Sequence, residues 1–87
     1  MTAPHPSRAL AFEWDESNED KLARRNIYAT DVEHVWANRP RYQKNKTSGT
    51  AAWKMIGRDA GGRTLCIGVL WADASDRILR AIFGWPV

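Results

Sequence analysis

The sequence lacks the features that mark secreted, membrane-bound or metal-binding proteins. Its one cysteine, Cys66, can form no disulfide within the chain, so packing alone has to hold the core. No apolar run approaches the roughly 20 residues of a membrane-spanning helix, and Met1–Arg8 lacks the apolar stretch of a signal peptide. His5 and His34 are far apart, and no Cys/His spacing matches a zinc site. We therefore expect a cytoplasmic protein with no cofactor and no metal.

What is present is a small, mildly basic chain with many large side chains. Five tryptophans and a hydrophobic content of 44% allow 87 residues to build one dense core. The net charge of +3 suits a negatively charged partner, such as RNA or an acidic protein, without requiring one. We expect a flexible tail over residues 1–9, where Pro4 and Pro6 stand among small polar residues, and a single domain over residues 10–87.

The first half of the chain predicts a strand followed by two helices. Leu10–Trp14 alternates apolar and polar residues, which is typical of a short strand with one buried face. Asp15 is a good N-cap for a helix over Glu16–Arg25, and Asn26 suits the left-handed position that ends such a helix. A second helix is expected to begin at the capping box Thr30–Glu33, which has a hydroxyl at the cap and a carboxylate three residues later.

The second half predicts mainly strands. Arg41–Thr50 is polar and basic and indicates a mobile connection, with an extra strand near Arg41 left open. Strands are expected over Ala51–Arg58, Thr64–Trp71 and Arg77–Trp85, and the second of them is apolar enough to be covered on both faces. In the last strand, alternation places Leu79, Ala81, Phe83 and Trp85 on one side and Ile78, Arg80 and Ile82 on the other. The predicted class is α+β, in the order β-α-α-β-β-β, with two helices covering one face of a small antiparallel sheet.

Short motifs along the chain, taken in order, are similar to those of a known family. They are Phe12-Glu13-Trp14-Asp15, Leu22–Ile27, Thr30–Glu33, Ile56-Gly57-Arg58, Gly62–Leu65 and Arg80–Pro86. Over roughly Phe12–Pro86 the chain resembles the BrnT-like toxins of bacterial type II toxin–antitoxin systems. The resemblance implies a RelE-like fold, metal-independent endoribonuclease activity, and neutralisation by a cognate antitoxin, either acidic or DNA-binding with a ribbon–helix–helix pattern.

Cleavage of RNA requires that the 2′-hydroxyl lose a proton, that charge on the phosphorane be stabilised, and that the leaving oxygen gain a proton. The family resemblance implies that cationic side chains converge for this purpose. The candidate catalytic residues are Lys21, Arg25, Arg63 and Arg80, and the candidate RNA contacts are Arg58, Lys44 and Lys46. Each also has a structural interpretation, as a solvated helix face, an exposed hairpin charge or an arginine stem over apolar surface.

Two functions therefore remain open. One is the endoribonuclease toxin. The other is a non-catalytic nucleic-acid- or protein-binding module on the same scaffold. The second is favoured because family members often carry His where this chain has Lys21 or Arg25, which leaves no obvious proton acceptor. Trp53 and Trp85 are the candidates for stacking on a base, should either be exposed beside basic residues.

Overall fold

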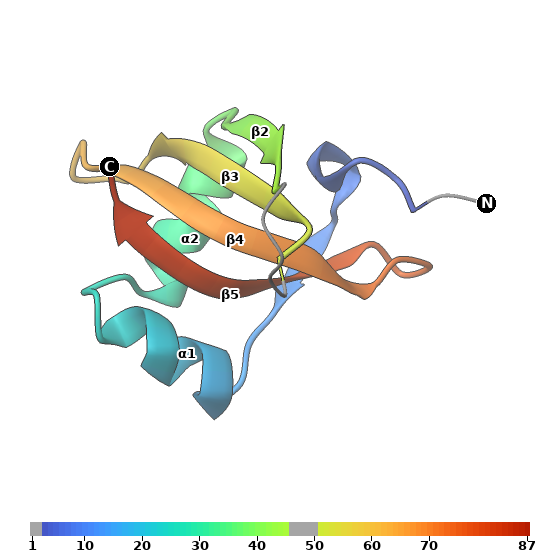
Figure 1. The fold of residues 1–87 in the computed structure, drawn as a ribbon, viewed down its shortest axis with the longest axis horizontal. Coiled ribbons are helices and arrows are strands. Elements are labelled where there is room, and N and C mark those ends of the chain that lie inside the picture. The colour runs from blue at the N-terminus through green and yellow to red at the C-terminus, as the bar shows by residue number, and fades with distance from the viewer. Residues whose placement is uncertain (1–2, 46–50) are drawn as a thin grey trace.

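A five-stranded sheet forms the centre of the fold (Figure 1). The computed structural model describes residues 3–45 and 51–87. The strands are β1 (Ala11–Glu13), β2 (Arg41–Lys44), β3 (Trp53–Arg58), β4 (Thr64–Asp73) and β5 (Ile78–Pro86). Their order across the sheet is β1-β5-β4-β3-β2. Every neighbouring pair is antiparallel except β1 and β5, which are parallel. The predicted α+β class is confirmed, but the all-antiparallel sheet is wrong at this edge.

Two strands refine the expectations for the second half of the chain. The polar segment after Pro40 begins with the edge strand β2, which pairs with β3 over its whole length and confirms the strand left open near Arg41, while residues 46–50 of the expected connection lie outside the described residues. In β4 the residues Leu65–Val69 are all buried, as the continuous apolar run predicts. The sequence of β2 is polar and has a low strand propensity, and its pairing with β3 shows that packing against the rest of the sheet outweighs that propensity.

Two short helices, α1 (Glu16–Ala23) and α2 (Ala29–Ala37), lie on one face of the sheet, α1 against β5 and α2 against β3 (Figure 1). In the ranges that the structure describes, no helix is long and apolar enough to cross a membrane. The core lies between helices and sheet. Its fully buried members are Leu22, Ile27, Val32, Val35, Met55, Leu65, Ile67, Val69, Leu79 and Ala81. The opposite side of the sheet carries no helix and is called the open face below.

The start of α1 is as predicted, and its end at Ala23 lies two residues before the predicted Arg25. Oδ1 of Asp15 accepts a hydrogen bond from the backbone N–H of Asn18 at 3.2 Å, and Asn26 adopts the left-handed conformation with φ of 58°. The capping box expected at Thr30 is wrong. Tyr28 is the N-cap residue of α2, and its backbone N–H donates to Asp31 Oδ2 at 2.9 Å. Asp31, two residues before Glu33, outcompetes it and moves the box two residues toward the N-terminus.

Residues 3–9, which belong to the segment expected to be a flexible tail, contact the sheet. A single 3₁₀ turn, η1 (Pro6–Arg8), begins with a buried proline. The ring of His5 meets the ring of Trp53 edge-on at 4.8 Å between centroids. The indole N–H of Trp71 donates to the carbonyl of Pro4 at 2.8 Å. The composition of the segment alone does not indicate these contacts of the described residues.

One extra residue in β5 reverses the direction of the side chains that follow it. The register pairs Val69 with Ala81 but Gly68 with Phe83, so Ile82 is an additional residue on β5. Two residues opposite one define a β-bulge, which bends the strand and disturbs the simple alternation of side chains.

The predicted sharing of one face by Leu79, Ala81, Phe83 and Trp85 is therefore wrong. Leu79 and Ala81 are fully buried beneath the helices. The ring of Phe83 lies on the open face, directly over Gly68, where a Cβ atom would come within 2.2 Å of Phe83 Cζ. Trp85, two residues further on, projects to the same side.

Candidate nucleic-acid interface

A groove runs between the C-terminal end of α1 and the end of β5, two segments that lie side by side in Figure 1. It has a volume of about 270 Å³. Lys21, Arg24, Arg25, Phe83, Gly84 and Trp85 line it. We call it the basic groove. A Cβ atom at Gly84 would lie only 3.0 Å from Leu22 Cδ2, so the missing side chain at Gly84 lets α1 approach β5 closely here.

The aromatic wall of the basic groove is a stacked pair. The rings of Phe83 and Trp85 lie 5.1 Å apart between centroids, with an angle of 7° between their planes. Both side chains are partly exposed. Flat, partly exposed rings beside cations are the usual means by which proteins hold unpaired bases, because every base offers a π face. Trp85 is thus a partly exposed tryptophan beside basic residues, as a residue that stacks on a base has to be.

The three cations of the groove are available to a ligand. Lys21 and Arg24 both lie at the end of α1, and Arg25 follows them directly. Within the described part of the chain, ion pairs are formed only by Arg63 and Arg80, so these three side chains have none. Neutralisation by phosphate groups would therefore break no internal ion pair.

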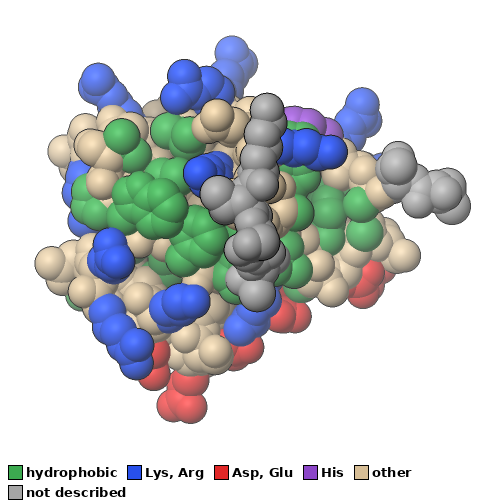
Figure 2. Space-filling model, viewed as in Figure 1, with side chains coloured by type: hydrophobic (Ala, Val, Ile, Leu, Met, Phe, Trp, Pro, Cys, Tyr) green, Lys and Arg blue, Asp and Glu red, His purple; other side chains and the backbone are tan. Residues whose placement is uncertain are grey.

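Basic residues also flank the aromatic pair on the side of β3. Strand register places Trp85, Cys66, Ile56 and Arg41 in one row across the sheet, and Phe83, Gly68, Lys54 and Gln43 in the next. Figure 2 views this face and shows hydrophobic side chains on it, with Lys and Arg around them and acidic side chains gathered at the α1 edge. The open face is thus an apolar patch with basic side chains on two sides and acidic ones as well along the α1 edge (Figure 2), and the basic side chains suit a polyanion with exposed bases.

Arg80 is held by carboxylates and does not reach the groove. Its Nη1 donates to Glu13 Oε1 and to Asp15 Oδ2, both at 2.8 Å, and its Nη2 donates to Asp15 Oδ1 at 3.0 Å. The parallel pairing of β1 with β5 brings Glu13 opposite Arg80. The guanidinium therefore ties the first strand and the cap of α1 to β5. A guanidinium in apolar surroundings needs a hydrogen-bonding partner, and for Arg80 the carboxylates of Glu13 and Asp15 in the same chain provide it.

Arg63 is likewise used to connect elements. Its Nε donates to Asp59 Oδ2 at 2.8 Å, and its Nη2 donates to the carbonyl of Asn26 at 2.9 Å and lies 3.6 Å from Asp31 Oδ2. Asp59 is 7% exposed, and its other oxygen accepts the backbone N–H of Arg63. The arginine therefore fastens the β3–β4 turn to the α1–α2 connection.

These two ion-pair clusters make an acid-sensitive contribution to stability. Hydrogen bonds from Arg80 and Arg63 lower the pKa of Asp15 and of Asp59 below its ordinary value. The unfolded chain then binds more protons than the folded one, so this stability is complete above the ordinary Asp pKa and is lost as the pH falls through the lowered values. We expect the urea concentration at the unfolding midpoint to decrease once the pH is below roughly 4, and to decrease less steeply in the variant Asp15→Asn/Asp59→Asn. Equal slopes in parent and variant would contradict this.

The three residues expected to contact RNA do not lie together. Arg58 is exposed at the end of β3, on the same open face as Lys54 but at the other end of the strand. Lys44 instead packs on Trp53, with Nζ 5.8 Å from the ring centroid, on the side of the sheet that holds the core. Lys46 lies outside the described residues. Of the stacking candidates, Trp53 belongs to this second side, against the ring of His5.

The structure therefore brings together two of the four proposed catalytic residues, Lys21 and Arg25, and engages Arg63 and Arg80 elsewhere. No histidine is among the described residues that line the basic groove. Burial raises the pKa of the Cys66 thiol, which suits an inert buried side chain. Among the described residues no group of His, Cys, Asp and Glu side chains is arranged to hold a metal ion.

Comparison of the chain with family models, curated proteins and solved structures finds no match. The assignment of function therefore depends on the groove itself. Sequence reasoning did not select three of the lining residues, Arg24, Phe83 and Gly84. Helical spacing does place Arg24 beside Lys21 and Arg25, whereas alternation along a regular strand places Phe83 in the core.

Proposed function

We propose that this protein binds single-stranded RNA in the basic groove and acts on it, in the cytoplasm, as the toxin of a bacterial type II toxin–antitoxin pair. The observation that supports RNA binding is the stacked pair of Phe83 and Trp85 beside three cations that form no ion pair with any described residue. A duplex buries the base faces that such a pair would contact, so unpaired RNA is the better ligand.

The toxin part of the proposal rests on the family resemblance. In a metal-independent cleavage, Lys21 and Arg25 would stabilise the negative charge of the phosphorane, because both line the groove in which the phosphate is expected. Arg63 and Arg80 are positioning residues in this scheme, since each is already bound to carboxylates. The cognate antitoxin is expected to cover the basic groove with acidic side chains.

A non-catalytic RNA-binding module is the second candidate. It is favoured by the engagement of Arg63 and Arg80 and by the lack of a histidine among the described residues that line the groove. Without a proton acceptor, cations bind and hold a phosphate but do little to deprotonate a 2′-hydroxyl.

A binding and cleavage assay with purified protein tests both candidates. We expect a labelled single-stranded RNA to bind at least about tenfold more tightly than the matching duplex, and Trp85→Leu to weaken single-strand binding about tenfold, because stacking on one base contributes roughly 1–3 kcal/mol. Tyr28→Leu is the matched control, since Tyr28 is an exposed ring outside the groove.

The outcomes separate the functions. Cleavage products that disappear in Lys21→Ala would support the toxin, and growth arrest on expression of the chain alone should disappear with them. Tight binding without products supports the binding module. Equal affinity for single strand and duplex, or equal effects of Trp85→Leu and Tyr28→Leu, would contradict RNA binding in the groove.

A further inference from the structure

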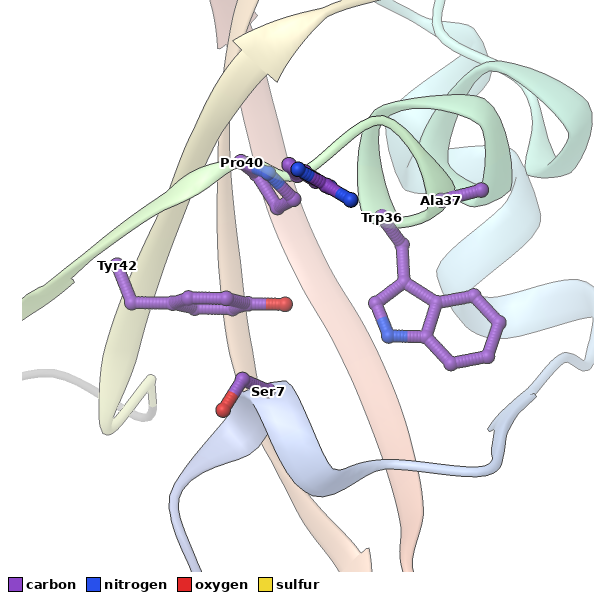
Figure 3. Close-up of a pocket in the computed structure, with 6 residues that line it drawn as sticks. Ser7, Trp36, Ala37, Pro40 and Tyr42 are labelled. Carbon is purple, nitrogen blue, oxygen red and sulfur yellow. The ribbon is translucent and has the colours of Figure 1, made fainter.

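A second concavity lies at the opposite end of the sheet from the basic groove. Ser7, Trp36, Ala37, Arg39, Pro40 and Tyr42 line it (Figure 3). It is formed where η1, the end of α2 and the edge strand β2 meet, and strands β4 and β3 separate β2 from β5. Its volume is about 340 Å³, near the lower end of the roughly 300–1,000 Å³ of small-molecule sites. It is called the Trp36 pocket below.

The walls of the Trp36 pocket are flat and are fixed by packing. Trp36 is partly buried, and its ring meets the ring of Phe12 edge-on at 5.4 Å between centroids. The ring of Tyr42 meets the ring of His5 edge-on at 5.2 Å between centroids. Pro40 also lines the pocket, and it lies so close to Gly57 that a Cβ atom there would be 3.2 Å from Pro40 Cβ. Aromatic walls held in this way favour a planar ring as ligand, because little side-chain entropy is lost on binding.

Unused hydrogen-bond donors face the same space. Figure 3 shows the Tyr42 hydroxyl pointing across the pocket toward Trp36, whose indole nitrogen lies on the pocket side of its ring. Within residues 3–45 and 51–87, neither group has a hydrogen-bond partner. Burial raises the pKa of Tyr42, so its hydroxyl remains a donor at neutral pH. No buried side-chain nitrogen or oxygen of the described residues lacks a partner, so both groups reach solvent and can donate to a bound acceptor in place of water.

The positive charge of Arg39 at the opening of the pocket favours a negatively charged hydrogen-bond acceptor. Arg39 is exposed, lines the pocket and has no ion pair with any described residue. Its φ of 50° is left-handed, at the point where the chain passes from α2 into Pro40. Guanidinium groups bind carboxylates through paired hydrogen bonds, so a ring ending in a carboxylate would satisfy both the walls and the donors.

We propose that the Trp36 pocket binds a small aromatic carboxylic acid, with its ring between Trp36 and Tyr42 and its carboxylate on Arg39. The Tyr42 hydroxyl and the Trp36 indole N–H supply further hydrogen bonds to the carboxylate. This site does not depend on the RNA-binding proposal, because the two share no residue.

Titration of ¹⁵N-labelled protein with benzoate or indole-3-carboxylate tests the proposal. The indole N–H resonance of Trp36 should shift saturably with a dissociation constant below roughly 10 mM, and the neutral analogue benzamide should bind at least about tenfold more weakly, because it loses the charge-assisted contact. Arg39→Gln should weaken benzoate binding about tenfold, and Tyr42→Phe several-fold. Arg41→Gln is the matched control, since Arg41 has the same charge but belongs to the open face.

Each variant's dispersed amide spectrum shows whether it is folded. A Trp36 resonance that does not respond to benzoate or indole-3-carboxylate would overturn the proposal. So would equal affinities for benzoate and benzamide, or equal effects of Arg39→Gln and Arg41→Gln, because the pocket would then be an apolar niche without a carboxylate site.

Discussion

Asn18→Asp should cost about 3–5 kcal/mol of unfolding free energy at pH 7, a large part of the stability of a domain this small. Asn18 is 2% exposed, and its side-chain amide is fully used. Oδ1 accepts the backbone N–H of Asp15 at 2.9 Å, while Nδ2 donates to the carbonyls of Glu13 at 3.1 Å and Ala81 at 3.0 Å. A carboxylate of the same shape would place negative charge against two carbonyl oxygens.

The location of Asn18 explains why the loss should be so large. Ala81 is the last paired residue before the bulge in β5, and Glu13 ends β1. One amide therefore joins the cap of α1, the parallel strand pair and the bulge. Removing the two N–H donors leaves the buried carbonyl of Ala81 and the partly buried carbonyl of Glu13 without this partner, and a buried group of this kind costs about 1–3 kcal/mol.

Urea unfolding at two pH values distinguishes this mechanism from simple loss of packing. The buried aspartate should have a raised pKa, so the folded variant takes up a proton as the pH falls, and the difference from the parent should shrink between pH 7 and roughly pH 4.5. Asn38→Asp, at the exposed C-cap of α2, is the control and should cost less than about 1 kcal/mol. A pH-independent loss in Asn18→Asp would exclude the proposed buried charge.

The order and type of the main elements can be predicted because local signals agree with the final fold. Asp15 and Asn26 mark the ends of a helix by their own hydrogen-bonding and backbone preferences, and the apolar run of β4 marks a central strand. Such signals act between neighbours in sequence. The partners of Arg80 and Arg63 are different: Glu13 lies 67 positions from Arg80, and Asn26 lies 37 positions from Arg63. Spacing does not indicate contacts of that range.

The site can be predicted only in part because of one residue. Periodicity alone places Phe83 and Trp85 in the core, since a strand without irregularity keeps alternate side chains on one face. The bulge at Ile82 moves both rings to the open face, where they meet the end of α1. A bulge depends on how two strands pair, which is a property of the sheet rather than of the segment. The cations of α1 are visible from helical spacing, whereas their aromatic neighbours are not.

Charge reversal in the basic groove, Lys21→Glu/Arg25→Glu, should reduce affinity for single-stranded RNA by roughly 100-fold or more at low salt, because two charge-assisted interactions with phosphate become repulsive. The dependence of log affinity on log salt concentration should also become shallower, by about 0.7 for each phosphate that the protein no longer neutralises. Fluorescence anisotropy of a labelled oligonucleotide across a salt series measures both quantities.

The control has to change net charge by the same amount. Arg8→Glu/Arg77→Glu does so with two exposed arginines, one at the end of η1 and one in the turn before β5, neither of which lines the groove. If general electrostatic attraction of a basic protein were responsible, both double variants would lose affinity alike. A much larger loss in Lys21→Glu/Arg25→Glu, together with the shallower salt dependence, would localise the phosphate to the end of α1 beside Phe83 and Trp85, where stacking and charge act on the same nucleotide.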